Sequence, residues 1–533
     1  MLPESQARTR RIRISPDDLQ RSLVAAMLEP AFYPQGPAEV SHGETHISHL
    51  FFAGDLVYKI KKAVRYSFVD YSTPAKRKYF LQEELRLNRR LAPSVYLGIL
   101  PISHDDYGWQ LGSDAHPAEY VLVMRRLPAR RMLDYLLEQG QATVPMMQSL
   151  AETLAQFHAE ARTSEKIRMR GRPEVVQEVL ERNLSDIRPF IGRLLSEETY
   201  AAIASFFSRS LSLHRGLMER RVDEGRIREL HGDLHCEHVC FAPEGIQIFD
   251  CVEFNPDLRR FDVAAEIAFL LMDLECRGAG ELGRTFLDRY VELSEDRELP
   301  ELLSLYKCYR ALVRGKVYAL QAAKMSDAAG RYFDLAYSYT WDEFKPFMIL
   351  VCGLTGSGKS TLARALGRRL GLPVVSSDVT RKTLAGPLAE PQLASYGEGI
   401  YNPAMTERTY ASLVEQAEPL MLDGRGAILD ATFRGQAHRA AVIALARKNR
   451  VPLVVIHCRL SEGLAQDRLA KRSAAGNDIS DGRWEIYAAQ KESFEPVVDV
   501  PAESYLVLDT ELSPAEVVSG AETFLRAALK RRS

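Results

Sequence analysis

The amino-acid sequence predicts two domains: an α+β domain over residues 1–340 and a three-layer α/β domain with a parallel sheet over residues 341–533. A chain of 533 residues is too long for one ordinary hydrophobic core. Its first part has hairpin-type strands followed by long helical stretches, whereas in its last third apolar strands alternate with helices, which is typical of a parallel sheet. The change of pattern near Thr340-Trp341-Asp342 sets the predicted boundary.

The first domain is predicted to begin with a helix. Ser15-Pro16-Asp17-Asp18 combines an N-cap, a proline at the first helical position and acids in the first turn, so a helix should run to about Leu28. The runs THISHLFF and LVYKIKK flank Ala53-Gly54-Asp55, which predicts a hairpin with a glycine turn. The expected elements that follow are a helix at 74–92, a strand at 119–127, helices to Arg221, short strands and loops at 230–254, and helices to Tyr339.

The second domain is predicted from four apolar runs, each followed by a helical stretch. The first run, FMILVCGL from Phe347, is continuously apolar, as expected of a strand buried on both faces. The other three are VVSSD, AILDATF and PLVVIHCRL. Their alternation with helices predicts the parallel sheet.

Composition and charge exclude some classes of partner. The chain has 69 Lys+Arg against 71 Asp+Glu, a net charge of -2, which makes nucleic-acid binding unlikely to be its main task. No run approaches 18 apolar residues, so no membrane-spanning helix is expected. The seven scattered cysteines predict a reducing, cytoplasmic location. The oligomeric state is not predicted.

The strongest motif is a phosphate-binding loop at the start of the second domain. The residues predicted to bind the nucleotide are the motif itself and the threonine that follows it: Gly353, Leu354, Thr355, Gly356, Ser357, Gly358, Lys359, Ser360 and Thr361. A buried strand precedes it and a helix follows, the context in which backbone N–H groups surround phosphates. Lys359 is predicted to reach the outer phosphates of ATP, and Ser360 to ligate Mg²⁺. The alternative is a glycine-rich turn that binds nothing.

Further polar residues at strand ends complete this predicted site. Asp378 is predicted to act as base toward an acceptor hydroxyl, with Arg381 as a substrate ligand, and Asp430 to join the Mg²⁺ shell. Arg468 and Arg472 are four residues apart on a predicted helix, so they share a face and are predicted to clamp the transferring phosphoryl group. Asp378 as a helix N-cap, and the two arginines as a solvated face, are the alternatives.

This second domain resembles small P-loop kinases of the gluconate kinase, polynucleotide 5′-kinase and zeta-toxin type, over about residues 347–525. The resemblance implies a P-loop NTPase fold and ATP-dependent transfer to a hydroxyl group.

The first domain carries a second candidate site. His231-Gly232-Asp233-Leu234-His235 is followed by Asp250 in an Ile-Phe-Asp context. Phosphoryl transfer needs a base beside the acceptor hydroxyl and a carboxylate on the metal, roles that Asp233 and Asp250 suit. Ordinary loop acids are the alternative.

These residues resemble the catalytic loop of the aminoglycoside phosphotransferase and choline kinase branch of the protein-kinase-like fold, over about residues 45–339. The resemblance implies a bilobal domain in which Lys59 binds phosphate, Glu84 (or its neighbour Glu83) pairs with Lys59, and Met124 begins the adenine hinge. It implies that Asp262 supports the loop. His238 stands where the family usually has a metal-binding asparagine, and an imidazole prefers softer or borderline ions to Mg²⁺.

Two alternatives concern the same segment of the chain. Zinc binding by His235, Cys236, His238 and Cys240 is disfavoured, because alternate residues of a strand point to opposite faces. The basic positions Lys59, Lys61, Lys62 and Arg65 are interpreted as a solvated strand edge plus one catalytic lysine, not as a nucleic-acid surface.

The order of the two domains resembles the bacterial fusion proteins described as bifunctional aminoglycoside phosphotransferase/ATP-binding proteins, whose second part is an AAA_33-type predicted kinase. The resemblance implies a bifunctional ATP- and Mg²⁺-dependent kinase acting on hydroxyl groups of small molecules. An ATP-regulated switch in which only the P-loop domain is catalytic, and a toxin-like or RNA-end kinase, are the alternative hypotheses. The acceptors are not predicted.

Overall fold

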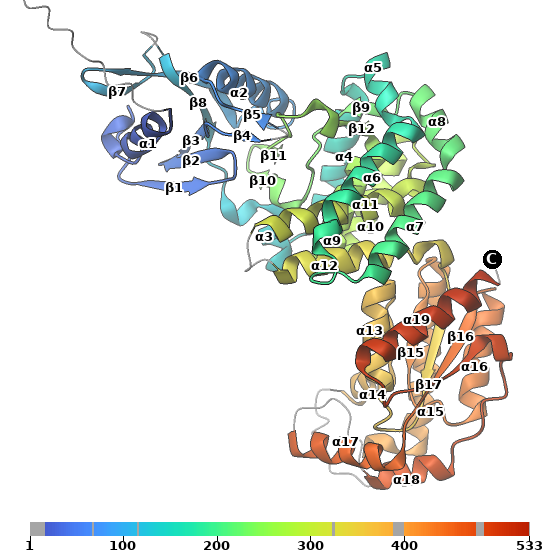
Figure 1. Ribbon diagram of the computed structural model, residues 1–533. Helices are drawn as coiled ribbons and strands as arrows, with labels where there is room; N and C mark the ends of the chain where they lie inside the picture. The colour runs from blue at the N-terminus through green and yellow to red at the C-terminus, as the bar shows by residue number, and fades with distance from the viewer. Residues whose placement is uncertain are drawn as a thin grey trace, which may run out of the picture. The chain divides into compact units, whose positions relative to one another are not determined.

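The computed structural model describes residues 16–66, 69–113, 117–321, 326–386, 399–475 and 484–531 of the chain. The chain forms two compact units (Figure 1). Unit 1 comprises Met1–Asp186 and Phe207–Val313, and unit 2 comprises Ile187–Phe206 and Arg314–Ser533. The domain division at residue 340 that the sequence suggested therefore stays a proposal beside this division by packing.

Unit 1 begins with an antiparallel sheet in the order β1-β2-β3-β8-β6-β7. Its strands are β1 (Val40–Glu44), β2 (Ser48–Ala53), β3 (Leu56–Lys61), β6 (Tyr96–Asp105), β7 (Gly108–Leu111) and β8 (Pro117–Arg125). The short strands β4 (Arg65–Tyr66) and β5 (Val69–Asp70) pair separately. The predicted hairpin is confirmed as β2 and β3, joined through Gly54 at φ 64°. The hairpin of β6 and β7 was not predicted.

A helix covers each face of this sheet. Helix α1 (Pro16–Met27) packs Leu23 and Met27 against Tyr58 and Ile60 of β3. It is the first helix that the sequence predicted; the predicted N-cap, Ser15, lies outside the described residues. Helix α2 (Pro74–Asn88) packs Leu81 on the opposite face. Successive side chains of a strand point to opposite faces, so Lys59 and Lys61 lie on the α2 side.

The rest of unit 1 is mainly helical, with two small strand pairs that carry the catalytic-type motif. The pairs are β9 (Ile227–Glu229) with β12 (Arg260–Asp262), and β10 (Val239–Ala242) with β11 (Gly245–Ile248). Helix α9 (Val263–Cys276) is buried from Val263 to Leu274, so it forms the centre of this region. The other helices are α3 (Leu133–Glu138), α4 (Val144–Glu160), α5 (Glu165–Arg168), α6 (Pro173–Ile187), α8 (Arg215–Asp223) and α10 (Gly280–Ser294). Helices α7 (Glu197–Leu213) and α11 (Leu299–Leu320) belong partly to unit 1 and partly to unit 2.

Unit 2 is a three-layer α/β domain, as predicted. Its parallel sheet has the order β14-β15-β13-β16-β17. The strands are β13 (Met348–Cys352), β14 (Val374–Ser376), β15 (Ala427–Asp430), β16 (Leu453–Arg459) and β17 (Tyr505–Asp509). The first four match the predicted apolar runs, and the edge strand β17 was not predicted.

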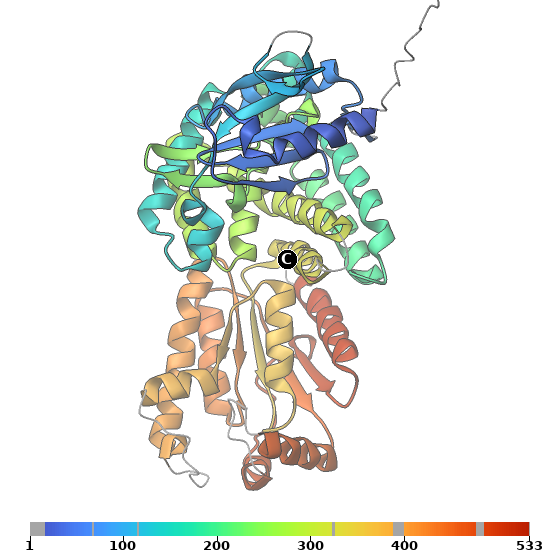
Figure 2. The ribbon, with the colours of Figure 1, turned by 90° about the vertical axis from the view of Figure 1, so that its left-hand side faces the viewer.

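Helices flank both faces of this sheet (Figure 2). Helices α15 (Pro403–Leu422) and α16 (Gln436–Lys448) build the core on one face, and α13 (Lys359–Leu370) and α19 (Pro514–Lys530) contact the strands from the other. The remaining helices of this unit are α12 (Ser326–Tyr339), α14 (Ser377–Ala385), α17 (Glu462–Ala475) and α18 (Trp484–Glu492).

Helix α12 belongs to unit 2 because of what it contacts. It packs on α13, the Tyr337 hydroxyl donates to Glu522 Oε2 of α19 at 2.9 Å, and the ring of Phe333 lies beside that of Phe190. Trp341 follows α12 in the chain, and the centre of its ring lies 3.9 Å from the guanidinium of Arg526 in α19. The change in sequence pattern near residue 340 therefore marks where the sheet begins, and packing divides the chain earlier.

Within the described part of the chain, no helix combines the length and apolar character needed to cross a membrane.

Candidate functional site

The phosphate-binding motif of unit 2 forms the turn between β13 and α13, where the sequence predicted it. Gly353, Gly356 and Gly358 have φ values of 142°, 79° and 82°, a region that residues with a side chain rarely adopt. A Cβ atom on Gly353 would lie 2.6 Å from the carbonyl oxygen of Cys458. These positions therefore require glycine, and α13 begins directly after them at Lys359, so its N-terminus faces any group held in the turn.

Two side chains from distant segments hold this turn in place. The amide N–H of Thr355 donates to Gln490 Oε1 of α18 at 2.9 Å, and the hydroxyl of Thr510 donates to the carbonyl oxygen of Ser357 at 2.8 Å. Leu354 packs against Ala465 and Leu469 of α17 and Tyr487 of α18. Sequence reasoning missed Gln490 and Thr510, because neither lies near the motif in the chain.

The donor set beside Lys359 suits a Mg²⁺ ion. Strands β13 and β15 are neighbours, so Asp430 at the end of β15 lies beside the turn, and its carboxylate accepts a hydrogen bond from Ser360. Burial raises the pKa of Asp430, while the Lys359 ammonium and the Ser360 hydroxyl oppose that rise. Asp430 Oδ1 is buried without a hydrogen-bond partner among the described residues. A buried, unpartnered carboxylate oxygen next to a hydroxyl is the oxygen-donor set that Mg²⁺ prefers.

Asp378 lies on the same edge of the sheet as Asp430. Strand β14 pairs Ser376 with Asp430, and Asp378 follows in the first turn of α14. Ser376 is the N-cap residue of that helix, so the N-cap interpretation of Asp378 is wrong. The negative charge of Asp378 also raises the pKa of Asp430, which indicates that the two carboxylates are close.

Arg381 is buried, and its contacts are within the protein. Its Nη1 donates to the carbonyl oxygen of Ile400 at 3.1 Å and to the Thr406 hydroxyl at 3.3 Å, and its guanidinium lies 5.0 Å from the centre of the Tyr401 ring. In this arrangement it anchors the start of α15, so its predicted role as a substrate ligand stays a prediction.

The predicted arginine pair on α17 is described only in part. Arg468 is half-buried, its Nη2 donates to the carbonyl oxygen of Thr510 at 2.8 Å, and its Nη1 lies 3.5 Å from where a Cβ on Gly358 would be. The solvated-face interpretation is therefore wrong for Arg468, which sits against the phosphate-binding turn. The side chain of Arg472 lies outside the described residues. Thr361, in the first turn of α13, is exposed.

In unit 1, three predicted residues meet in an ion-pair cluster, in which Lys59 and Glu84 are buried and Asp250 is half-exposed. Lys59 Nζ lies 2.6 Å from Glu84 Oε1 and 3.0 Å from Asp250 Oδ1. Of the two candidate partners, Glu84 makes the pair, and Glu83 instead pairs with Arg86. Burial lowers the pKa of Lys59, but Asp250 and Glu84 outweigh burial and hold that pKa well above its ordinary value. Lys59 is therefore a cation held in place by Glu84 and Asp250.

Lys61 joins the same cluster, which sequence reasoning missed. Its Nζ lies 2.5 Å from Glu84 Oε2 and 2.5 Å from Glu253 Oε1, and Glu253 also accepts a hydrogen bond from Tyr71. The interpretation of this run as a solvated strand edge is wrong, because β3 lies between β2 and β8 and Lys61 is fully buried. Arg65, four residues on, is exposed.

Asp233 and Asp250 lie on the loops before and after the β10–β11 hairpin. The loop around Asp233 is fixed by His231, whose Nε2 donates to the carbonyl oxygen of Phe249 at 2.9 Å. Burial lowers the pKa of His231 to about 4, so this imidazole is neutral at physiological pH. Asp250 has φ 62°, a left-handed conformation rare outside glycine and typical of strained functional positions.

Buried polar groups of α9 and α11 support this loop. Gly232 N–H donates to Glu266 Oε1 at 2.7 Å, Cys236 N–H donates to Asp273 Oδ2 at 3.0 Å, and Arg310 Nη1 donates to the Gly232 carbonyl oxygen at 3.1 Å. Asp262, the residue expected in this role, instead caps α9 and pairs with buried Arg221. Sequence reasoning missed Glu266, Asp273 and Arg310, because charged residues within helices usually face solvent.

The turn after Asp233 brings two imidazoles together. Cys236–His238 is a 3-10 helix, in which residues three apart stack, and the ring centres of His235 and His238 are 3.9 Å apart. Asp233 Oδ2 lies 3.6 Å from a ring nitrogen of each. The strand argument against a metal here was therefore wrong in its geometry, although the cluster that forms among the described residues contains Asp233 and no cysteine.

Met124, the predicted start of the adenine hinge, is buried in the core between β8 and α2. The next amide, of Arg125, donates to the Val95 carbonyl oxygen at 2.8 Å. The hinge role of Met124 stays a prediction.

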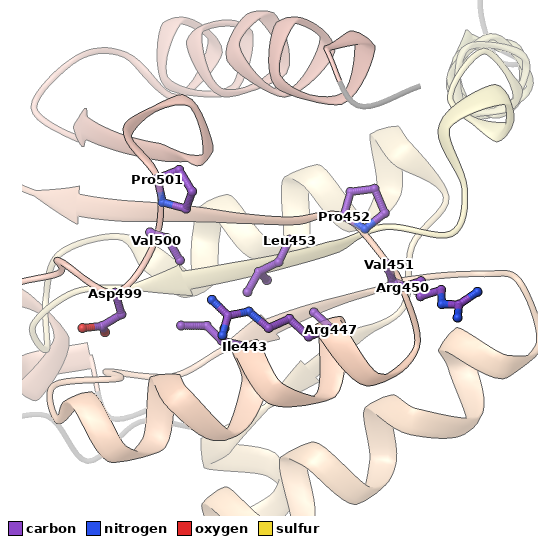
Figure 3. A pocket seen from close by; sticks show the side chains of 10 residues that line it. Ile443, Arg447, Arg450, Val451, Pro452, Leu453, Asp499, Val500 and Pro501 are labelled. Carbon is purple, nitrogen blue, oxygen red and sulfur yellow. The ribbon is translucent and has the colours of Figure 1, made fainter.

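Unit 2 has a cavity of ≈ 440 Å³. Figure 3 shows the side chains that line it. Its lining includes Arg447 in the last turn of α16, Pro452 and Leu453 at the start of β16, and Asp499 before β17. In a parallel sheet the strand starts share one edge, and the phosphate-binding turn follows the opposite end of β13. This cavity is therefore not part of the predicted nucleotide site.

Comparison with known proteins gives matches in both parts of the chain. Residues 348–497 match the family model AAA_33, an AAA domain. An uncharacterized protein of Mycobacterium tuberculosis is 31% identical over 453 residues, covering 84% of this chain and 88% of that protein. A shikimate kinase of Paramagnetospirillum magneticum is 33% identical over 86 residues, or 16% of this chain and 44% of that enzyme. A choline/ethanolamine kinase family structure from Mesorhizobium loti covers 59% of this chain and 94% of its own, at 12% identity and a TM-score of 0.37.

Proposed function

This chain belongs to the same family as that mycobacterial protein, and we propose that it is a bifunctional ATP-dependent phosphotransferase acting on hydroxyl groups of small molecules. The P-loop domain has the firmest support, because the AAA domain match and the similarity to a shikimate kinase both favour a kinase-type phosphoryl transfer. The acceptor of each module is open. Seven free thiols favour a cytoplasmic location.

The single observation that carries the proposal for unit 2 is the buried Asp430 oxygen beside Ser360 and Lys359 at the mouth of a glycine-rich turn. The turn amides and Lys359 would hold the phosphates of ATP, and Mg²⁺ bound to Ser360 and Asp430 would neutralise their charge. Asp378 would accept the proton of the acceptor hydroxyl. The acceptor oxygen would form a bond to the γ-phosphorus of ATP while the bond between that phosphorus and the β–γ bridging oxygen breaks, and ADP would leave. Arg468 and Arg472 would stabilise the transferring phosphoryl group, and Arg381 would bind the acceptor.

Unit 1 would perform the same transfer with other residues. Lys59, held by Glu84, would bind the nucleotide phosphates, and Asp250 with His238 would hold the metal ion. Asp233 would take the acceptor proton, on a loop fixed by Glu266, Asp273 and Arg310. The Lys59–Glu84 pair supports this assignment, because it places a charged amine on a strand that faces the strained Asp250.

The test is transfer of label from γ-labelled ATP into a small-molecule extract by the full chain. Lys359→Ala should abolish one set of products and Asp233→Asn another. Exposed Lys448→Ala and Asp223→Asn are the matched controls and should leave both sets unchanged. Products that survive both active-site substitutions would refute the proposal.

A second candidate function is an ATP-regulated switch in which unit 1 binds nucleotide without transferring phosphoryl. The observation that favours it is His238, an imidazole at the position predicted to ligate the nucleotide's metal ion. Nucleotide bound by the Lys359→Ala chain with no ADP formed would support the switch, and ADP formation by that chain would exclude it.

A further inference from the structure

We propose that the metal site of unit 1 selects a first-row transition-metal ion such as Mn²⁺ or Co²⁺ over Mg²⁺, whereas the site in unit 2 takes Mg²⁺. This inference rests on the proposed function insofar as the ion is the one that accompanies the nucleotide. It is drawn from the side chains that face Asp250.

The ring of His238 is oriented by a hydrogen bond to the backbone. Its Nδ1 lies 2.8 Å from the carbonyl oxygen of Asp233, an acceptor, so Nδ1 carries the proton. A neutral imidazole protonated at Nδ1 has its lone pair on Nε2. Metal-binding histidines are typically held in this way, with one ring nitrogen donating to a carbonyl and the other ligating the ion.

The lone pair of His238 faces a carboxylate oxygen. His238 Nε2 lies 3.7 Å from Asp250 Oδ2, which is too long for a hydrogen bond. It is shorter than about 4.2 Å, the sum of two metal–ligand bonds to nitrogen and oxygen, so an ion placed between the two atoms would reach both. The other oxygen of Asp250, Oδ1, is held by Lys59, which leaves Oδ2 toward the imidazole.

A further carboxylate lies at the Nδ1 edge of the same imidazole. The Asp233 carboxylate is 3.6 Å from ring nitrogens of both His238 and His235. A donor set that mixes imidazole nitrogen with carboxylate oxygens suits first-row transition ions, while Mg²⁺ prefers oxygen ligands in octahedral geometry.

The second unit supplies an internal comparison. Its predicted ligands, Ser360 and Asp430, are both oxygen donors, and Asp430 Oδ1 is the buried oxygen there. One chain therefore holds two nucleotide-type sites of different donor chemistry. A nitrogen ligand to a bound ion would come from unit 1.

The test uses the full chain with Mn²⁺ and a non-hydrolysable ATP analogue. Electron spin-echo modulation detects the ¹⁴N nucleus of an imidazole bound to Mn²⁺. We expect ¹⁴N modulation in the wild type and in the exposed control His104→Asn, and its loss in His238→Asn, which offers an amide oxygen instead. The Mg²⁺ concentration that displaces half of this Mn²⁺ should fall about 10- to 100-fold in His238→Asn. Labelling wild-type histidines with ¹⁵N should change the modulation without any substitution.

Each outcome decides the inference. Absence of nitrogen modulation in the wild type, or modulation unchanged in His238→Asn, would overturn it. Nitrogen ligation without phosphoryl transfer by unit 1 would leave the inference intact and refute the proposed function there. Transfer by unit 1 that runs equally well on Mg²⁺, without nitrogen ligation, would support the function and overturn the inference.

Discussion

At the residue scale, the defining feature of unit 1 is one buried carboxylate between two buried ammonium groups. Glu84 contacts Lys59 through one oxygen and Lys61 through the other. Charges removed from water are tolerated only when they are paired, so each member depends on the others. Because these ion pairs hold Lys59 in place, our proposal implies that Lys59 would meet a nucleotide without reorganisation.

Glu84→Gln should lower the free energy of unfolding by about 3 kcal/mol, because it leaves two buried lysines short of a negative charge. Denaturant unfolding of the full chain measures this change. The control is the neighbouring Glu83→Gln, whose pair with Arg86 is partly exposed and should contribute only about 0–1 kcal/mol. Equal losses for the two substitutions would contradict the account.

His231 should make stability depend on pH in a defined window. Its folded pKa is about 4, below the ordinary 6.5, so between these values the unfolded chain binds the proton and the folded chain does not. Stability is thus complete above pH 6.5 and falls as the pH decreases toward 4, by about 3 kcal/mol for this group. His231→Gln, which keeps a donor for Phe249, should remove that part of the slope. Because His49 and His457 also have pKa values of about 4, the difference between the two chains is the quantity to measure. Parallel stability curves for the two chains would exclude this role.

Some of these residues could be predicted from sequence and others could not. Lys59, Asp233 and Asp250 stand in motifs whose spacing indicates their chemistry. The burial of Lys61 depends on β8 pairing with β3 from far along the chain, which converts an apparent edge into an interior strand. Glu266 and Asp273 lie in an almost wholly buried helix, where their charges show only once the loop they bind is known.

At the scale of elements, the phosphate-binding turn is a local structure stabilised by distant ones. Its glycines and the helix after it follow from the motif alone, so the turn was predicted correctly. Gln490 and Thr510 reach it from α18 and from the end of β17, and no local pattern points to them. The 3-10 helix at Cys236–His238 was likewise predicted to be strand, because three residues are too few to show a helical periodicity in the sequence.

Gly353→Ala should abolish nucleotide binding by unit 2, because the new Cβ would collide with the Cys458 carbonyl and the residue would keep an unfavourable φ. Calorimetric titration with an ATP analogue measures this loss. Gly463→Ala on α17, where a Cβ meets nothing within 4 Å, is the matched control and should bind as wild type. Unchanged affinity in Gly353→Ala would show that the turn does not hold phosphate.

At the scale of the whole molecule, the chain combines two units with different architectures and, by our proposal, one kind of chemistry. The parallel sheet of unit 2 was predictable because each strand is a continuous apolar run. The division of the chain was not, because α12 carries a helical pattern suited to either unit and only its contacts with α13 and α19 decide. Edge strand β17 was missed because its apolar run, Tyr-Leu-Val-Leu at 505–508, is short and mostly only partly buried.

The central claim is that one chain holds two nucleotide sites, and the most direct test is the stoichiometry of binding. Equilibrium dialysis with a non-hydrolysable ATP analogue and both Mg²⁺ and Mn²⁺ should give two sites in the wild type. Lys359→Ala and Lys59→Ala should each retain one site, and the double substitution none. A single site in the wild type, lost entirely with Lys359→Ala, would contradict the account.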